Sequence, residues 1–524
     1  MSIKSHPKGL YVLFFTEAWE RFSYYGMRAL LVLYLVKHIN MARHEALEIY
    51  ALYTGLVYFT PMIGGYLADK YLGARKAIII GGLVMALGHL AMAFESLLYT
   101  ALGLLIVGNG FFKPNISTIV GGLYEEHDPR RDGGFTIFYM GINLGAFFSP
   151  LVCGTLGETI GWHWGFSAAG IGMVAGLLVF LLGQKILGPK GFPPHSTREY
   201  LTAKDYFDVL VYTVASVAFV FGFLKFWEFF GPRWKEFTFA SKTMFSVLSI
   251  AAVLAVGKLF AKKNRAVPGA LYKNGAEETG DAPLSWEEWQ RIIVICVISI
   301  FVIFFWMGFE QAGGTLTLFA DQQTDRHFMG FEIPASYFQS INPLAIMLMA
   351  PFFSILWYSL DDSKYALSTP AKMAIGMITL GLGFIVMYFG QSLAFSGDSN
   401  KLTSVALTNG FQVFPGTVYI REFGKVGPLW LAMVYLIHTI GELCLSPIGL
   451  SMVTKLSPER FVSLMMGIWF VSSALSNYLA GRLEEILTVY QFNIYIFLIM
   501  SSIGAGLLLL ALTPMLNKWS HGKA

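Results

Sequence analysis

The stretch EAWERFSYYG, residues 17–26, places ionised side chains inside an otherwise apolar run. LYVLFFT precedes it and MRALLVLYLV follows it, and the three stretches together are long enough to cross a lipid bilayer as one helix. Glu17, Glu20 and Arg21 lie inside the stretch, and Arg28 follows two residues beyond it. A charge at the bilayer centre costs at least about 2.5–3.5 kcal/mol. We therefore expect these groups to have partners or to face a wet cavity.

The composition of the chain is that of a polytopic membrane protein. Of its 524 residues, 55% are hydrophobic and 13% are charged, and the mean hydropathy is +0.58. Soluble proteins carry about 25% charged residues. The three cysteines all lie in apolar runs, so we expect no disulfide framework.

Apolar runs recur along the whole length and predict fourteen membrane-spanning helices. The predicted spans are 10–37, 47–69, 76–96, 99–122, 135–158, 164–186, 205–230, 241–261, 288–320, 334–360, 368–391, 427–455, 461–484 and 489–515. This order predicts an all-α membrane protein with a six-helix bundle in 1–190, an inserted helix pair and linker in 191–286, and a second six-helix bundle in 287–524. Ser285, three residues before Glu288, predicts a capping box that starts the ninth span.

Lysine and arginine are distributed unequally over the predicted loops. With both termini in the cytoplasm, the cytoplasmic segments carry about 22 of them and the outer segments about 10. The positive-inside rule thus predicts a multi-pass protein of the cytoplasmic (inner) membrane, surrounded by lipid, with both termini cytoplasmic.

Residues 17, 21, 24, 25 and 28 share one face of the first predicted helix, because they are spaced by three, four and seven. At 1.5 Å per residue, Arg21 lies near the bilayer midplane. Glu17 can pair with Arg21 one turn away, which would make the cluster self-neutralised and purely structural. That pairing leaves Arg28 unexplained.

Three further charges lie inside predicted spans of both halves. Lys113 is in GNGFFKPNIS of the first half, Glu310 in FFWMGFEQAGG and Glu442 in HTIGELCLSPIGL of the second. A cavity between the halves would therefore have a basic wall facing an acidic wall. Such a cavity suits a zwitterion, and a dipeptide or tripeptide separates its two charges by roughly 5–10 Å.

The depths of two charges in their spans predict a contact between the halves. Arg28 is about 18 residues from the inner end of its span, and Glu310 is about 20 residues from the inner end of its own. We expect the two to pair. Protonation of Glu310 would break the pair and couple a proton to movement of the outer side.

Several stretches resemble the proton-dependent oligopeptide transporters of the major facilitator superfamily. EAWERFSYYG is similar to the family signature ExxERFxYYG, and GGYLADKYLGARK (64–76) is similar to a loop motif of the superfamily. FFKPNISTIVGGLY (111–124) and DGGFTIFYMGINLGAFFSPLVCG (132–154) agree as well. The resemblance implies the major facilitator fold with the extra helix pair of bacterial members. It also implies import of di- and tripeptides with protons, by alternating access and without a cofactor.

The resemblance also implies roles for individual residues. Arg21 and Lys113 would attract the peptide carboxylate. Glu442 would hold the amino end together with Asn143 and Asn342. The predicted proton-coupling residues are Glu17, Glu20, Arg21, Arg28, Lys113 and Glu310. The predicted peptide-binding residues are Arg21, Tyr25, Tyr58, Lys113, Tyr139, Asn143, Trp306, Asn342, Glu442, Trp469 and Ser473.

One position departs from the mammalian members of this family. They carry a histidine on the second helix, where IYALYTGLVYFTP (49–61) has Ala51. A histidine switch at that position is excluded, so coupling is expected to use carboxylates.

Other classes of function have weaker support in the sequence. The chain has no phosphate-binding GxxxxGK[ST] motif, and its basic residues form no patch outside the cytoplasmic loops, so we expect neither an ATP-driven pump nor nucleic-acid binding. His438 and Glu442 are one helical turn apart, but two ligands do not make a zinc site, and we expect no enzyme. Two alternatives to peptide import remain open. One is another major facilitator carrier, an anion importer or a drug exporter, and the other is a peptide sensor that does not transport.

Overall fold

The chain is described by a computed structural model over residues 6–125, 128, 130–192, 201–236, 284–328, 330–361, 366–396, 402–404, 419–421, 425–458 and 461–522. Eleven helices within these ranges are long and apolar enough to cross a membrane. α1 (Lys8–Lys37) is long enough as well, but it carries too many charged side chains to be counted among these eleven. The chain is therefore the all-α polytopic membrane protein that its hydropathy predicts. The predicted eighth span, 241–261, lies outside the described residues.

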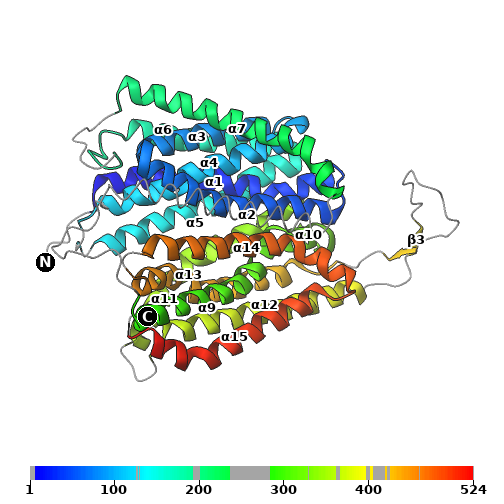
Figure 1. The fold of residues 1–524 in the computed structure, drawn as a ribbon. Coiled ribbons are helices and arrows are strands. Elements are labelled where there is room, and N and C mark those ends of the chain that lie inside the picture. Colours follow the sequence, from blue (N-terminus) through cyan, green and yellow to red (C-terminus); the bar gives the residue numbers. More distant parts are fainter. Residues whose placement is uncertain are drawn as a thin grey trace.

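The helices form two groups that lie on opposite sides of the molecule (Figure 1). The first group contains α1, α2 (Arg43–Leu67), α3 (Ala74–Ala91), α4 (Leu98–Gly122), α5 (Arg131–Thr155) and α6 (Trp162–Leu182). The second contains α9 (Trp286–Phe309), α10 (Thr315–Gln323), α11 (Ile341–Asp361), α12 (Thr369–Ser396), α13 (Pro428–Leu456), α14 (Val462–Val489) and α15 (Ile494–Trp519). The short elements are η1 (Ala68–Leu72), η2 (Glu95–Leu97), η3 (Leu156–Ile160), η4 (Glu310–Gly313), η5 (Ala335–Ser340), β1 (His327–Phe328), β2 (Phe331–Glu332), β3 (Leu402–Ser404) and β4 (Tyr419–Arg421).

Each group is held together mainly by its own helix pairs. α1 packs on α5 and α6 in the first group, and α12 packs on α13 and α15 in the second. The two groups meet where α2 contacts α14 and where α5 contacts η5 and α11. Figure 1 places both termini at the same end of the helices. The predicted domain boundaries at 190 and 286 stay predictions.

Small residues allow the closest helix contacts. Gly64 of α2 lies against the backbone of Gly110 in α4, so that a Cβ at Gly64 would collide with the Gly110 carbonyl. Gly145 of α5 approaches the Ala18 carbonyl of α1 in the same way. Close backbone approach of this kind is how helices associate in membranes, where the hydrophobic effect does not drive them together.

The helix α7 (Ala203–Glu236), which follows the first group, packs on α3 and α4. Lys76 at the start of α3 lies 2.9 Å from Asp208 and 3.4 Å from Asp205 of α7. Arg75 beside it donates to the carbonyl of Lys190, at 2.6 Å, in the segment that leads toward α7. The two carboxylate contacts of Lys76 thus fix α7 to the first group.

The predicted ninth span is two helices. Its start is confirmed, because Ser285 Oγ accepts from the Glu288 amide and Glu288 Oε2 accepts from the Ser285 amide. α9 nevertheless ends at Phe309, and α10 begins at Thr315 after η4. The hydropathy pattern does not show this break, which falls at the glycine pair Gly313 and Gly314. A Cβ at Gly313 would collide with the Tyr50 hydroxyl of α2, so the break lets the other group approach closely.

Candidate functional site

A cavity of about 660 Å³ lies between the two helix groups. Side chains of α1, α2, α4 and α5 line one wall, and side chains of α9, α11, α13 and α14 line the other. The predicted site residues that line it are Tyr25, Arg28, Tyr58, Lys113, Tyr139, Asn143, Trp306, Glu310, Asn342, Glu442, Trp469 and Ser473. Its volume lies within the range of small-molecule sites, about 300–1,000 Å³.

Arg28 of the first group and Glu310 of the second form an ion pair across the cavity wall. Their side chains are 9% and 3% exposed. The predicted pairing is therefore confirmed, and it joins residues that are 282 positions apart. A buried pair of this kind is costly to separate, because each charge would remain without its partner in a medium of low polarity.

Two tyrosines support the Arg28 guanidinium. Its Nε donates to the Tyr50 hydroxyl at 2.7 Å, and its Cζ lies 5.7 Å from the centre of the Tyr25 ring. Tyr50 is a residue that the sequence reasoning did not name, although it is the neighbour of Ala51. Hydrogen bonding and ring contact together hold the guanidinium toward Glu310.

Lys113 brings the second positive charge of the first group to the cavity. Its ammonium lies 4.2 Å from the centre of the Tyr58 ring. No carboxylate of the described residues forms an ion pair with it. The side chain lines the cavity and is partly exposed, so it is a cation that an anionic ligand can reach.

Glu442 is the counterpart of Lys113 in the second group. Asn342 Nδ2 donates to Glu442 Oε2 at 2.8 Å and lies 3.0 Å from Thr439 Oγ1. Within the described part of the chain, Glu442 has no cationic partner. Lys113 and Glu442 are therefore opposite charges on opposing walls, and neither forms an ion pair with another residue that the structure describes.

Arg21, Glu17 and Glu20 do not line this cavity. The Arg21 Nε lies 3.0 Å from Glu17 Oε1 and donates to Glu20 as well. Asn109 Nδ2 of α4 donates to Glu20 Oε1 at 3.2 Å. The predicted i, i+4 pairing is confirmed. Both carboxylates engage the Arg21 guanidinium, and its predicted contact with a peptide stays a prediction.

Two further polar residues of the predicted site, Asn143 and Ser473, bond within their own helices. Asn143 Nδ2 donates to the Tyr139 carbonyl at 3.0 Å, and Ser473 Oγ donates to the Trp469 carbonyl at 3.2 Å. Each of the two side chains therefore has a donor that is satisfied without a ligand.

Comparison with known proteins agrees with this geometry. The model of the POT family matches residues 75–500. The chain belongs to the POT family. Among its relatives, the uncharacterized transporter YclF of Bacillus subtilis is 34% identical over 528 residues, which cover 99% of this chain and 96% of that protein. The peptide transporter YePEPT of Yersinia enterocolitica is 36% identical over 495 residues, which cover 91% and 87%. A crystal structure of a peptide transporter POT in complex with sulfate matches with a TM-score of 0.74 at 34% identity and covers 99% of this chain and 97% of that one.

Further polar residues of this POT family chain line the cavity although the predicted site does not include them. Among them are Gln339, Tyr435, His438, Ser446 and Asn477. His438 precedes Glu442 by one helical turn, and this spacing is a signal in the sequence for its place on the wall. The others belong to no motif.

Ion pairs also join the halves of this POT family chain at the end of the helices away from both termini (Figure 1). They are Lys37–Asp321 at 2.7 Å, Arg43–Glu484 with Nη2 and Oε2 3.0 Å apart, and Arg482–Glu48 at 2.7 Å. At the opposite end, no ion pair among the described residues joins the two groups. Among the described residues, ion pairs therefore join the two groups at the far end and, through Arg28 and Glu310, beside the central cavity.

A carboxylate of the first group caps a short helix of the second at the same far end. Glu158 of η3 accepts from the amides of Ala335 and Ser336 of η5, at 2.8 and 3.0 Å. Thr155 Oγ1 lies 2.6 Å from the Tyr337 hydroxyl. A carboxylate at a helix N-terminus satisfies amides that otherwise lack partners.

Proposed function

We propose that this chain is a proton-coupled symporter that imports di- and tripeptides across the cytoplasmic membrane by alternating access. The observation that carries the proposal is the pair of opposite charges, Lys113 and Glu442, on opposing walls of the central cavity, neither of which forms an ion pair with another described residue. A peptide has a carboxylate for the first and an ammonium for the second. The similarity to a named peptide transporter supports the same substrate.

The two side chains that would bind the ends of the peptide belong to different halves of the protein. A bound peptide would therefore bridge the two halves that move during transport. Tyr25, Tyr58 and Trp306 supply aromatic surface between the two charges. Aromatic surface accepts many side chains without selecting one, which suits a carrier of mixed peptides. A sensor that only binds peptide would not require the buried ion pair between the halves.

Proton coupling is proposed to act at two places. Protonation of Glu310 removes its charge and weakens the pair with Arg28, which releases one contact between the halves. Glu17, Glu20 and Arg21 carry one net negative charge when ionised, and Lys113 offsets it electrostatically. A peptide carboxylate at Lys113 adds a second negative charge there. Protonation of either glutamate would compensate it, so peptide and proton would bind together.

The orientation follows the positive-inside rule, with both termini in the cytoplasm and surrounding lipid on all sides. The ion-paired end then faces outward, and the structure corresponds to a state closed to the outside. The proposed bodies of the movement are 1–190 and 287–524, with 191–286 as an insertion attached to the first.

The test uses the full chain in liposomes with labelled dialanine and an imposed inward proton gradient. The expected result is accumulation above the external concentration that disappears when a protonophore collapses the gradient. Uptake that ignores the gradient would exclude proton coupling, and the absence of any dialanine movement would exclude peptide transport.

A further inference from the structure

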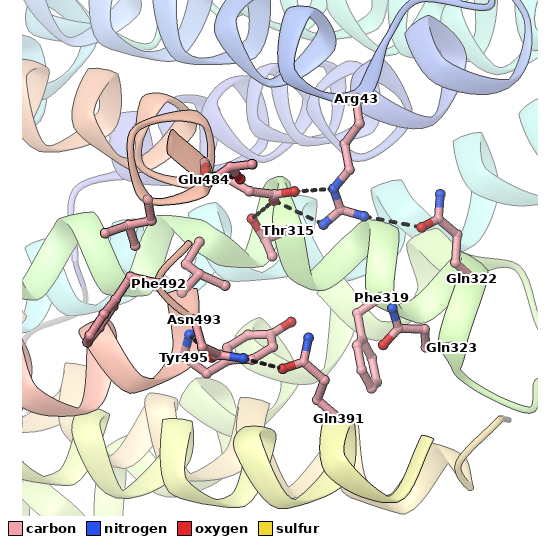
Figure 2. A pocket seen from close by; sticks show the side chains of 13 residues that line it. Arg43, Thr315, Phe319, Gln322, Gln323, Gln391, Glu484, Phe492, Asn493 and Tyr495 are labelled. Carbon is pink, nitrogen blue, oxygen red and sulfur yellow. Dashed lines mark hydrogen bonds and ion pairs between the residues drawn. The ribbon is translucent and has the colours of Figure 1, made fainter. Parts of the chain in front are cut away.

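A second cavity, of about 380 Å³, lies at the end of the molecule that carries the ion pairs between the halves. Figure 2 shows that Arg43 of α2 reaches into it from the first group, whereas its other lining residues belong to the second group. Those shown are in α10, α12 and α14 and at the start of α15. This volume is at the lower end of the range for small-molecule sites.

Arg43 and Glu484 provide the charged lining residues of this cavity. Two guanidinium nitrogens of Arg43 face both carboxylate oxygens of Glu484, and Nη1 donates to Gln322 Oε1 at 3.1 Å (Figure 2). Thr315 Oγ1 donates to Glu484 Oε2 at 3.2 Å. The side chains of Arg43 and Glu484 are 33% and 23% exposed. Water and ligands can reach both, and an ion pair this exposed adds little to stability.

Side-chain amides form much of the remaining polar lining. Gln322, Gln323, Gln391 and Asn493 all line the cavity (Figure 2). Asn493 Nδ2 donates to Gln391 Oε1 at 2.9 Å. Gln323 Oε1 is shielded from solvent and has no hydrogen-bond partner among the described residues. Amides that both donate and accept are suited to the backbone of a peptide.

The charges are ordered across the halves as in the central cavity. In both cavities the first group supplies the cation, Arg43 or Lys113, and the second supplies the anion, Glu484 or Glu442. In the orientation proposed above, this second cavity lies toward the outside of the membrane, and we call it the outer cavity. A zwitterion that entered the outer cavity would therefore already have the orientation that the central cavity requires.

We propose that the outer cavity is a capture subsite for zwitterionic di- and tripeptides. The peptide carboxylate binds Arg43 and its ammonium binds Glu484, so that the peptide replaces the ion pair between the halves and loosens the contact of α2 with α14. The proposal rests on the proposed function and adds a second peptide site to it.

The first test separates capture from a simple electrostatic latch. Arg43→Gln and Glu484→Gln are each expected to raise the KM of dialanine uptake about five- to tenfold, since each removes one charge-assisted contact to the peptide. The double variant Arg43→Glu with Glu484→Arg restores an ion pair but reverses its direction, and we expect its KM to stay raised. A KM restored by the double variant would overturn the proposal in favour of a latch.

A matched control lies on the same two helices. Arg482 of α14 pairs with Glu48 of α2 at 2.7 Å, but neither residue lines the cavity. Arg482→Gln is expected to leave the KM unchanged. A rise equal to that of Arg43→Gln would show that any ion pair at this end has the same effect, which would also overturn the proposal.

The second test detects the outer site without transport. Gln391→Cys, combined with Glu442→Gln to disable the central cavity, is modified with a membrane-impermeant maleimide, and a parent without Gln391→Cys gives the background. We expect dialanine to slow the modification and dialanine amide, which lacks the carboxylate, to do so much less. If dialanine does not slow the modification while the wild-type protein transports dialanine, the outer site alone would be overturned. Failure of wild-type uptake with the slowing intact would instead overturn the proposed function.

Discussion

Among the arginine–glutamate pairs that join the halves of this protein, Arg28–Glu310 and Arg43–Glu484 differ mainly in their burial. Arg28–Glu310 lies beside the central cavity with side chains 9% and 3% exposed, whereas Arg43–Glu484 lies at the far end with side chains 33% and 23% exposed. Breaking a buried pair by removing one partner costs about 3–5 kcal/mol, and an exposed pair contributes about 0–1 kcal/mol. Under the proposed mechanism, the same chemistry gives one contact that needs a proton to open and another that a solute can displace.

Glu310→Gln is expected to have the largest effect on transport. It leaves Arg28 without a charged partner and removes the proposed proton acceptor between the halves. Gradient-driven dialanine uptake should be abolished, while exchange of dialanine between the two sides at equal concentration should persist. Glu48→Gln, which neutralises a carboxylate at the end of the helices away from both termini, is the matched control and should retain driven uptake. Loss of both driven uptake and exchange in Glu310→Gln would point to a role in folding or peptide binding instead.

The coupling between Arg28 and Glu310 should be visible in thermal stability. Arg28→Gln and Glu310→Gln alone should each destabilise the protein, and the double variant should be more stable than the sum of the two predicts. We expect a coupling energy above about 2 kcal/mol, because each single change leaves a buried charge unpaired. Thermal unfolding of the four proteins in detergent measures it. A coupling energy near zero would show that the buried pair does not act as a unit.

Tyr50→Phe should have an intermediate effect. It removes only the hydroxyl that accepts from Arg28 Nε at 2.7 Å and keeps the ring. A hydrogen bond to a charged group contributes about 1.5–3 kcal/mol, so we expect driven uptake to fall about tenfold or more with Glu310 still present. Tyr53→Phe, a buried tyrosine one turn away on α2 that does not line the cavity, is the control. Equal losses in both variants would mean that α2 is disturbed as a whole.

The smallest effect is expected from Arg43 and Glu484, when the thermal stability of the two single glutamine variants, the double variant and the wild-type protein is compared in the same way. Both side chains are partly solvated, so we expect a coupling energy of at most about 1 kcal/mol that falls with added salt. A value equal to that of Arg28 and Glu310, measured under the same conditions, would contradict the distinction drawn from burial.

Spacing and motifs in the sequence predict the membrane helices and much of the central site. The depth of Arg28 and Glu310 in their spans predicts their contact, because helix rise converts position into height. The break between α9 and α10 does not show in the mean hydropathy, because the apolar residues on both sides of 310–315 join into one long apolar segment. Arg21 and Arg28 share a helix face, but Arg21 pairs with Glu17 and Glu20, whereas Arg28 pairs with Glu310. A shared face therefore does not predict which partner each side chain meets. The outer cavity draws on several distant segments of both halves, and no local motif connects them.

The central claim is that Lys113 and Glu442 recognise the two charged ends of a peptide. Its most direct test measures how well dialanine, dialanine amide and N-acetyl-dialanine compete with labelled dialanine in exchange across liposomes. The wild-type protein should prefer dialanine to both blocked peptides. Lys113→Gln should lose the preference over the amide only, and Glu442→Gln should lose the preference over the acetylated peptide only. Preferences that both variants retain unchanged would contradict the account.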